Sequence, residues 1–111
     1  MKVEYILENG SYRPRIVDVN SSNTQLLNCF LEDAENSLPI YLGLIDKAQN
    51  GEEITGSSSN QVGVDFYPDK VTIEHLWSDD ENGEPLYTEI PLKQAKQLLQ
   101  SLKSAKDNLR I

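Results

Sequence analysis

One histidine, His75, and one cysteine, Cys29, are the candidates for nucleophilic or acid–base chemistry in this sequence. His75 falls in an alternating segment beside Ile73 and Trp77, where a lone histidine is more often a packed or rim residue than a catalyst. Cys29 lies on an apolar helical stripe, where a free thiol behaves as a small hydrophobe. A cysteine–histidine pair also needs a third group that orients the imidazole. We therefore expect no enzyme; a small enzyme that uses His75 and outward-facing carboxylates is the competing hypothesis.

Metal, phosphate and nucleic-acid sites are not indicated either. Residues 79–84 superficially resemble a calcium loop, but the alternating ligands and the glutamate at the twelfth position are missing. The glycines are scattered, so no glycine-rich phosphate loop is formed. Lysines follow the C-terminal helix without interleaved aromatic residues, and they accompany an acidic body. We expect no cofactor, no metal and no nucleic acid.

Charge is the strongest compositional signal. The net charge is −8 over 111 residues. Residues 92–111 carry five basic side chains and one acidic side chain, which leaves −12 for residues 1–91. An acidic body disfavours nucleic acid, whose phosphates dominate its affinity for proteins. It favours a basic protein partner, because opposed charge speeds association. The competing interpretation of this charge is that it only provides solubility.

An aromatic pair brackets the acidic run, and this combination is the best candidate site. Aromatic side chains supply anchoring area at protein interfaces, and carboxylates engage lysine or arginine on a partner. Trp77 shares the register of Val71 and Ile73, so core packing is the alternative for it. The predicted partner-binding residues are Trp77, Asp79, Asp80, Glu81, Glu84 and Tyr87, with Glu52 and Glu53 in another loop as a weaker second group.

Hydrophobic periodicity places these residues on strands and loops around three helices. The expected strands are residues 3–8, 13–19, 62–67, 71–77 and 86–90. Asn9-Gly10 predicts a tight hairpin turn between the first two. The expected helices run from the cap candidates at 21–24 to Ala34, from Asn36 or Ser37 to Ala48, and from Pro91 to Leu109. Residues 51–60 are expected to be a loop, with at most a short edge strand near Ile54.

This order, β-β-α-α-β-β-β-α, predicts an α+β fold. The sheet should be antiparallel or mixed, with about five strands and with helices packed on one face. The length fits one domain spanning residues 1–111. A single cysteine excludes an internal disulfide, and neither a signal peptide nor an apolar run of membrane-spanning length is present. We therefore expect a cytoplasmic protein that does not enter a membrane.

The layout of residues 37–105 resembles a known class. A short helix and a polar loop are followed by segments 60–66 and 69–74, an acidic loop, the segment Tyr-Thr-Glu-Ile-Pro-Leu at 87–92, and a closing helix rich in alanine and leucine. This order is similar to that of small bacterial immunity proteins of contact-dependent inhibition and related polymorphic toxin systems. Many of these are short acidic α+β proteins that neutralise a toxin's C-terminal domain, often a nuclease, in the cytoplasm.

The resemblance implies a stoichiometric role. An acidic surface would cover the substrate cleft of a basic nuclease, or a neighbouring exosite, and exclude RNA or DNA. The alternative is a non-catalytic adaptor or accessory protein that binds another cytosolic protein.

Overall fold

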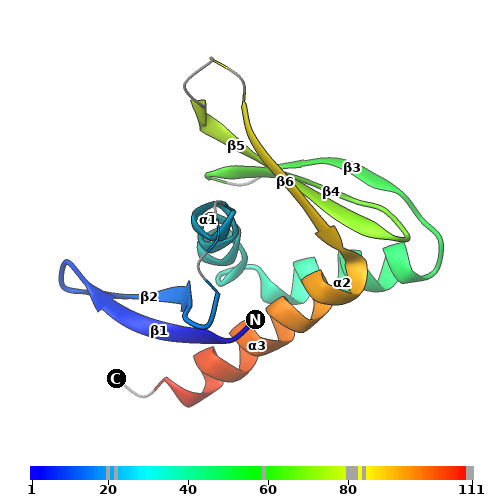
Figure 1. The fold of residues 1–111 in the computed structure, drawn as a ribbon. Helices are drawn as coiled ribbons and strands as arrows, with labels where there is room; N and C mark the ends of the chain where they lie inside the picture. Colours follow the sequence, from blue (N-terminus) through cyan, green and yellow to red (C-terminus); the bar gives the residue numbers. More distant parts are fainter. Residues whose placement is uncertain (20, 22, 59, 80–82, 84, 110–111) are drawn as a thin grey trace.

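The computed structural model describes residues 1–19, 21, 23–58, 60–79, 83 and 85–109. Within them the chain is an α+β protein with the element order β-β-α-α-β-β-β-β-α (Figure 1). The elements are β1 (Val3–Glu8), β2 (Ser11–Ile16), α1 (Thr24–Ala34), α2 (Leu38–Gln49), β3 (Ile54–Ser58), β4 (Val62–Phe66), β5 (Lys70–Asp79), β6 (Pro85–Pro91) and α3 (Leu92–Asn108). None of these helices has the length and apolar character needed to cross a membrane.

The α+β prediction is confirmed, but the strands form two antiparallel sheets instead of one sheet of about five strands. β1 and β2 make a separate hairpin, and the larger sheet has the strand order β3-β4-β5-β6. The added strand is β3, which occupies the segment that we expected to be mostly a loop. It pairs with β4 through a register shift between Ile54 and Ser57, where Gly56 has a φ of +78°. A polar, glycine-containing edge strand of this kind gives little periodic signal in a sequence.

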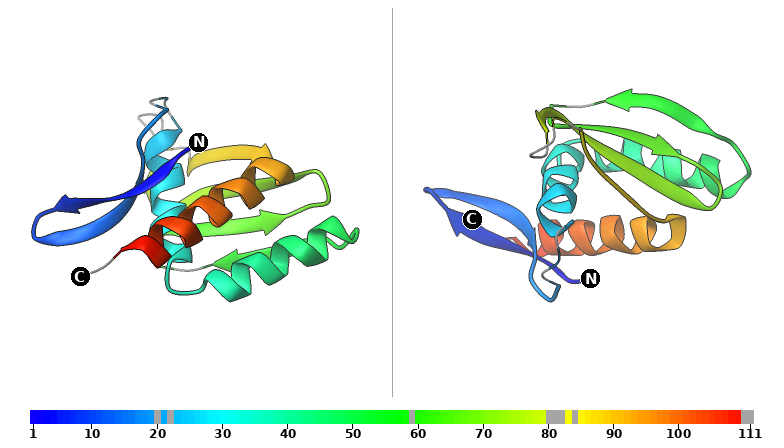
Figure 2. Two further views of the ribbon diagram at one scale, coloured as in Figure 1. Left: turned by 90° about the horizontal axis from the view of Figure 1, so that it is seen from below. Right: turned by 45° about the horizontal axis from the view of Figure 1, so that its top comes forward.

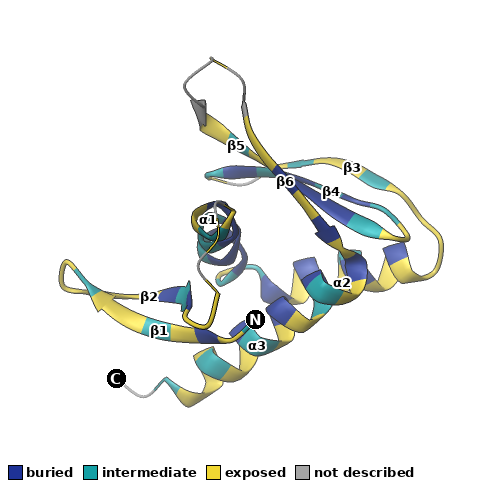
Figure 3. Ribbon diagram, viewed as in Figure 1, coloured by how far each residue is buried: buried dark blue, intermediate teal, exposed yellow. Residues whose placement is uncertain are grey.

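The three helices cover one face of the four-stranded sheet, and no described element covers the other face (Figures 1 and 2). α2 and α3 lie side by side, while α1 is seen along its axis in Figure 1 and so crosses them steeply. Alternation decides which strand residues are covered. Val62, Val64 and Phe66 of β4 are buried, whereas the residues between them are partly exposed (Figure 3). The strand and the buried face that the alternation predicts in this part of the sequence are therefore confirmed.

An aromatic group joins the helices to the sheet in the core. Phe30 of α1 packs edge-on against Tyr41 of α2, with ring centroids 5.7 Å apart and planes at 82°. The Tyr41 ring then lies 6.2 Å from the ring of Phe66 on β4. These arrangements are favourable because the positive edge of one ring meets the negative face of another. Leu98, Leu99 and Leu102 of α3 complete the floor of the core.

The β1–β2 hairpin extends from the body as an arm (Figure 1). Its turn has the geometry that Asn-Gly predicts, because φ is +49° at Asn9 and +82° at Gly10. A two-stranded hairpin is marginally stable alone in water. At its base Val3 and Ile16 face each other and are buried against the helices, which anchors the arm.

The last helix begins one residue later than the sequence predicted. Pro91 still pairs with Lys70 in the sheet and has extended backbone angles, so α3 starts at Leu92. The backbone N–H of Leu92 donates to the carbonyl of Asp69 at 3.1 Å. The direct passage from strand to helix therefore places the first turn of α3 beside the β4–β5 turn.

Two isoleucines on α2 provide a matched test of this packing. Ile45 is 0% exposed and Ile40 is 65% exposed. We expect Ile45→Ala to lower the free energy of unfolding by about 2–5 kcal/mol, because it leaves a cavity. Ile40→Ala should change it by less than about 0.5 kcal/mol. Urea denaturation followed by circular dichroism measures both, and equal effects would show that α2 does not pack in this register.

Candidate protein-binding surface

Strand β5 extends beyond the helices that cover its first half. Val71 and Ile73 are fully buried and His75 is half-buried, but Trp77 is 78% exposed. Core packing of Trp77, the alternative that its register allowed, is therefore wrong. The distal end of β5 extends past the helices (Figure 3), and Trp77 belongs to this half of the strand. The only tryptophan of the chain stands on the surface, as the partner-binding hypothesis requires.

The indole of Trp77 is held in place although it is exposed. Its Nε1–H donates to the backbone carbonyl of Asn60 at 2.6 Å, and its backbone N–H donates to Nδ1 of His75 at 3.2 Å. The adjacent Leu76 N–H donates to the carbonyl of Gln61 at 2.9 Å. Nε1 is the only polar atom of this side chain, and its N–H already has a hydrogen-bond acceptor. A partner can cover this ring without leaving an unpaired donor.

Other large apolar side chains accompany Trp77 on the distal part of β5 and β6. Tyr87 is 54% exposed, and its hydroxyl donates to Oε2 of Glu89 at 3.1 Å. The exposed apolar residues of this part are Leu76, Trp77, Leu86 and Tyr87. Clustered exposed apolar residues on a small protein mark interaction surfaces more often than single ones do.

The remaining predicted site residues divide into two groups. Asp80, Glu81 and Glu84 lie outside the described residues. Asp79 ends strand β5, but its side chain is likewise outside what the structure describes.

The second predicted group, Glu52 and Glu53, is exposed in the connection between α2 and β3. The register of the sheet separates this group from Trp77. Ile54 pairs with Phe66, at the end of the sheet where α3 begins, whereas Trp77 lies past the opposite end of β4. The structure therefore brings Trp77 and Tyr87 onto the same two strands and does not bring Glu52 and Glu53 to them.

Cys29 and His75 line the same small pocket, although nothing local in the sequence indicated that they would meet. The pocket has a volume of about 270 Å³ and lies between α1 and the β5–β6 pair. Its lining consists of Asn23, Gln25, Leu26, Cys29, His75, Leu86 and Tyr87. No described carboxylate lines it, so the acid groups needed by the competing enzyme hypothesis are not gathered here.

The chemistry of this pocket does not favour a reactive thiolate. Partial burial, together with the charges of Glu32 and Asp33, raises the pKa of the Cys29 thiol. A nucleophilic cysteine needs the opposite shift. Nδ1 of His75 accepts the hydrogen bond from the Trp77 backbone, so this nitrogen is occupied as an acceptor. Among the described residues, no group of three or more histidine, cysteine or acidic side chains is placed to hold a metal ion.

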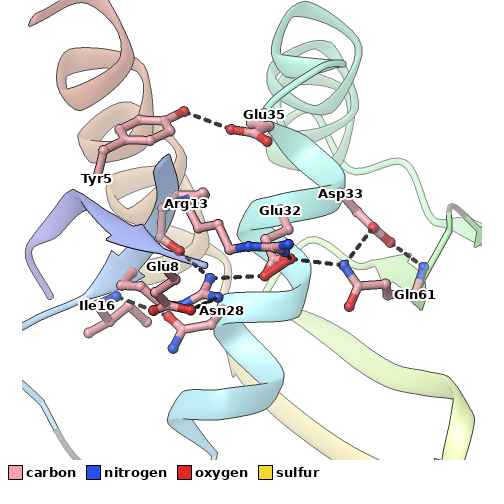
Figure 4. A network of polar contacts seen from close by, with 11 residues as sticks. Tyr5, Glu8, Arg13, Ile16, Asn28, Glu32, Asp33, Glu35 and Gln61 are labelled. Carbon is pink, nitrogen blue, oxygen red and sulfur yellow. Dashed lines mark hydrogen bonds and ion pairs between the residues drawn. The ribbon is translucent and has the colours of Figure 1, made fainter. Parts of the chain in front are cut away.

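Two adjacent acids of α1 connect the separate parts of the fold (Figure 4). Asp33 is buried, and its Oδ2 accepts the backbone N–H of Gln61 at 2.8 Å and that of Val62 at 3.0 Å. Asp33 thereby fixes the start of β4. The carboxylate of Glu32, the preceding residue, accepts hydrogen bonds from Nη1 of Arg13 at 3.1 Å and from Nη1 of Arg15 at 2.9 Å. These two ion pairs hold the β1–β2 hairpin.

Arg15 also forms a bidentate pair with Glu8 within the hairpin, with both N–O distances at 2.9 Å. Burial opposes the charge of Arg15, but its hydrogen bonds to Glu8 and Glu32 outweigh that effect and raise its pKa. The hydrogen bond from Arg15 lowers the pKa of the Glu8 carboxyl. We did not predict this network. Its one sequence signal was a pair of arginines two residues apart on a strand, which places them on the same face.

Comparisons with known proteins give no relative from which function can be transferred. No protein-family model, no curated protein and no solved structure matches the chain.

Replacement of Asp33 tests the connection between α1 and the sheet. In Asp33→Ala the N–H groups of Gln61 and Val62 lose their acceptor, and each unsatisfied donor costs about 1–3 kcal/mol. We expect the free energy of unfolding to fall by at least about 2 kcal/mol. The matched control is Asp46→Ala on the exposed face of α2, which should stay within about 0.5 kcal/mol of the parent. Equal values for the two variants would contradict the role of Asp33.

Quenching of Trp77 fluorescence tests whether the surroundings of the indole are electronegative. Because the acidic run begins two residues after Trp77, Cs⁺ should quench its fluorescence more efficiently than iodide does, relative to N-acetyltryptophanamide. Replacement of Asp79, Asp80, Glu81 and Glu84 by serine should reduce that preference. If the two quenchers act equally on the parent protein, the surface around Trp77 is not electronegative.

Proposed function

We propose that this chain is an immunity protein that binds a cationic toxin domain, of the nuclease type, and neutralises it in the cytoplasm without catalysis. The observation that carries the proposal is Trp77: a large aromatic side chain that is 78% exposed, is held by its own hydrogen bond and is followed in the sequence by an acidic run. The likeness of the layout of residues 37–105 to small bacterial immunity proteins supplies the class of partner.

The surface around Trp77 has the properties of an interface centre. Tryptophan and tyrosine are enriched among the residues that dominate binding energy, and both are present here on neighbouring strands. Trp77 loses little conformational entropy on binding, because the Asn60 carbonyl already fixes its orientation. Leu76 and Leu86 are also exposed on these strands. Leu76 lies on the outer face with Tyr87, whereas Trp77 projects from the other side of β5.

The distribution of charge supports a cationic partner. The described lysines of the last twenty residues all belong to α3, on the helical side of the molecule (Figure 1). The uncovered face of the sheet carries Asp65, Glu74 and Glu89, with Lys70 close to Glu89. The acidic side of the protein is therefore not neutralised by its basic helix. A cationic cleft is what an enzyme that acts on nucleic acid presents, because it must bind phosphates.

Neutralisation then follows from occupancy. An acidic protein that covers the substrate cleft, or an exosite beside it, excludes RNA or DNA by occupying their place. Opposed charge raises the association rate, and a few buried aromatic anchors lengthen the lifetime of the complex. No bond is made or broken, so one immunity protein neutralises one toxin domain.

The proposal predicts that the gene directly upstream encodes a toxin, and titration of that toxin's C-terminal domain tests it. Toxin activity should fall linearly with added protein and vanish at a one-to-one ratio. Trp77→Ala should weaken binding by about 30-fold or more, because loss of an interface anchor costs about 2 kcal/mol. Ile40→Ala, which removes another exposed apolar side chain from a different element, should bind like the parent. Isothermal titration calorimetry measures all three proteins.

Unchanged toxin activity at a molar excess of this protein would reject the proposal. A neighbouring gene that encodes no toxin, together with capture of a different cytosolic protein through Trp77, would instead support the adaptor alternative.

A further inference from the structure

Two cross-strand rows of side chains cross the uncovered face of the four-stranded sheet. In the first row, Thr72 of β5 stands between Asp65 of β4 and Glu89 of β6. In the second row, Glu74 stands between Gly63 and Tyr87. Directly opposite residues in an antiparallel sheet have Cβ atoms about 5 Å apart. Three carboxylates and one aromatic ring are therefore gathered on a small area of the sheet.

This area is hollowed instead of flat. A depression of about 360 Å³ is lined by Asp65, Thr72, Glu74, Leu76 and Tyr87, and by the small residues of β3 and β4. Gly63 is part of its floor; a Cβ atom at this position would come within 3.4 Å of the side chain of Leu76. The missing side chain at Gly63 keeps the depression open between Leu76 and the edge strand β3.

The side-chain hydroxyl of Thr72 is a further polar group in the depression. Thr72 is only 9% exposed and lines the depression, yet its side chain makes no hydrogen bond within the described part of the chain. No buried side-chain nitrogen or oxygen of the described residues lacks a partner, so the Thr72 oxygen is accessible to solvent in the depression. A hydroxyl in this position is available to a ligand that enters the depression.

The charges on this face are also unbalanced. Asp65 accepts the backbone N–H of Gly56 at 2.8 Å, and Glu89 pairs with Lys70 at 3.4 Å. Glu74 forms no ion pair or hydrogen bond with any described residue. Glu74 lies diagonally across the strands from both Asp65 and Glu89, and like charges this close repel. Among the described residues, the lining of the depression contains no basic side chain, so the exposed carboxylate of Glu74 is open to a cation from a partner.

The shape and the groups of the depression fit one kind of cation. A guanidinium is planar, donates several hydrogen bonds in a fixed geometry, and stacks on aromatic faces. Glu74 offers a carboxylate for a two-point hydrogen bond, Tyr87 offers a ring, and the Thr72 hydroxyl offers an acceptor. Leu76 offers apolar contact for the aliphatic part of the side chain.

We propose that the depression on the outer face of the sheet receives an arginine side chain of a cationic protein partner. This inference rests on the proposed function, and it names the recognition chemistry of that partner. Glu74 pairs with the guanidinium, Tyr87 covers one face of it, and Thr72 accepts a hydrogen bond from it. Trp77, whose strand alternation places it on the other side of β5, contributes a second contact area at the same end of the sheet.

Titration with N-acetyl-L-arginine amide, followed by ¹H–¹⁵N NMR of the full chain, tests this site without any toxin. We expect saturable shifts of the amide signals of Gly63, Thr72, Glu74 and Tyr87. N-acetyl-citrulline amide has nearly the same shape but no charge, and it should bind at least about fivefold more weakly. Glu74→Gln should weaken arginine binding by a similar factor. Glu4→Gln, at an exposed glutamate on the β1–β2 hairpin, should leave it unchanged.

Equal responses to the arginine and citrulline compounds would overturn the proposal, and so would shifts spread evenly over all surface acids. Both glutamate substitutions are isosteric and lie on the surface, and the dispersion of the NMR spectrum reports whether they fold. The titration and the toxin assay fail independently. Arginine binding without neutralisation would leave this site in place and reject the immunity role, whereas neutralisation that survives Glu74→Gln unchanged would retain the role and reject the site.

Discussion

The arrangement of this protein depends on two consecutive carboxylates of α1 that act in different directions. Asp33 binds the backbone at the start of β4, and Glu32 binds the two arginines of the β1–β2 hairpin. Neither sheet pairs with the other, so strand hydrogen bonds cannot hold them together. The helix supplies the connection: its apolar stripe enters the core, while its two acids orient the parts on either side. A buried carboxylate that accepts two backbone N–H groups is also strongly specific, because no apolar residue can replace it.

The acids that hold the parts of the fold together are different from the acids on the outer face of the sheet. Glu8 and Glu32 are paired with arginine, and Asp33 is paired with backbone. Among the carboxylates that the structure describes on the outer sheet face, Glu89 has an ion pair, with Lys70. Charge of one sign on one face lowers the stability of the folded state through repulsion, but it attracts an oppositely charged surface over about one Debye length.

Much of the fold followed from the sequence, because its signals were local. Apolar periodicity located all three helices, Asn9-Gly10 fixed the first turn, and the alternation from Val62 to Phe66 identified the central strand. Prediction failed where the signal depends on neighbours distant in the chain. Strand β3 is polar and pairs with β4 along a shifted register, so a sequence that allowed only a short edge strand near Ile54 did not show its full length. Alternation placed Trp77 on the correct face of β5, but the sequence did not show that the helices end before it.

The sequence identified some residues of the candidate site and missed others. Trp77 and Tyr87 were identified from an aromatic pair beside an acidic run, and both are exposed on the surface. The cross-strand neighbours of Glu74 were not foreseen, since Asp65 and Glu89 approach it only through the pairing of three strands. The shared pocket of Cys29 and His75 was missed for the same reason: helix α1 brings one residue and strand β5 the other.

The alternation of β4, β5 and β6 has a consequence for how such a protein can change over generations. In β4 buried core residues alternate with partly exposed ones, and Glu74, Tyr87 and Glu89 of the neighbouring strands are exposed on the outer face. Substitutions at positions 63, 65, 74, 87 and 89 alter the outer face without repacking Phe66, Ile73 or the helices beneath them. Selection for a new binding partner and selection for folding therefore act on different residues of the same strands, which permits rapid divergence of specificity on an unchanged scaffold.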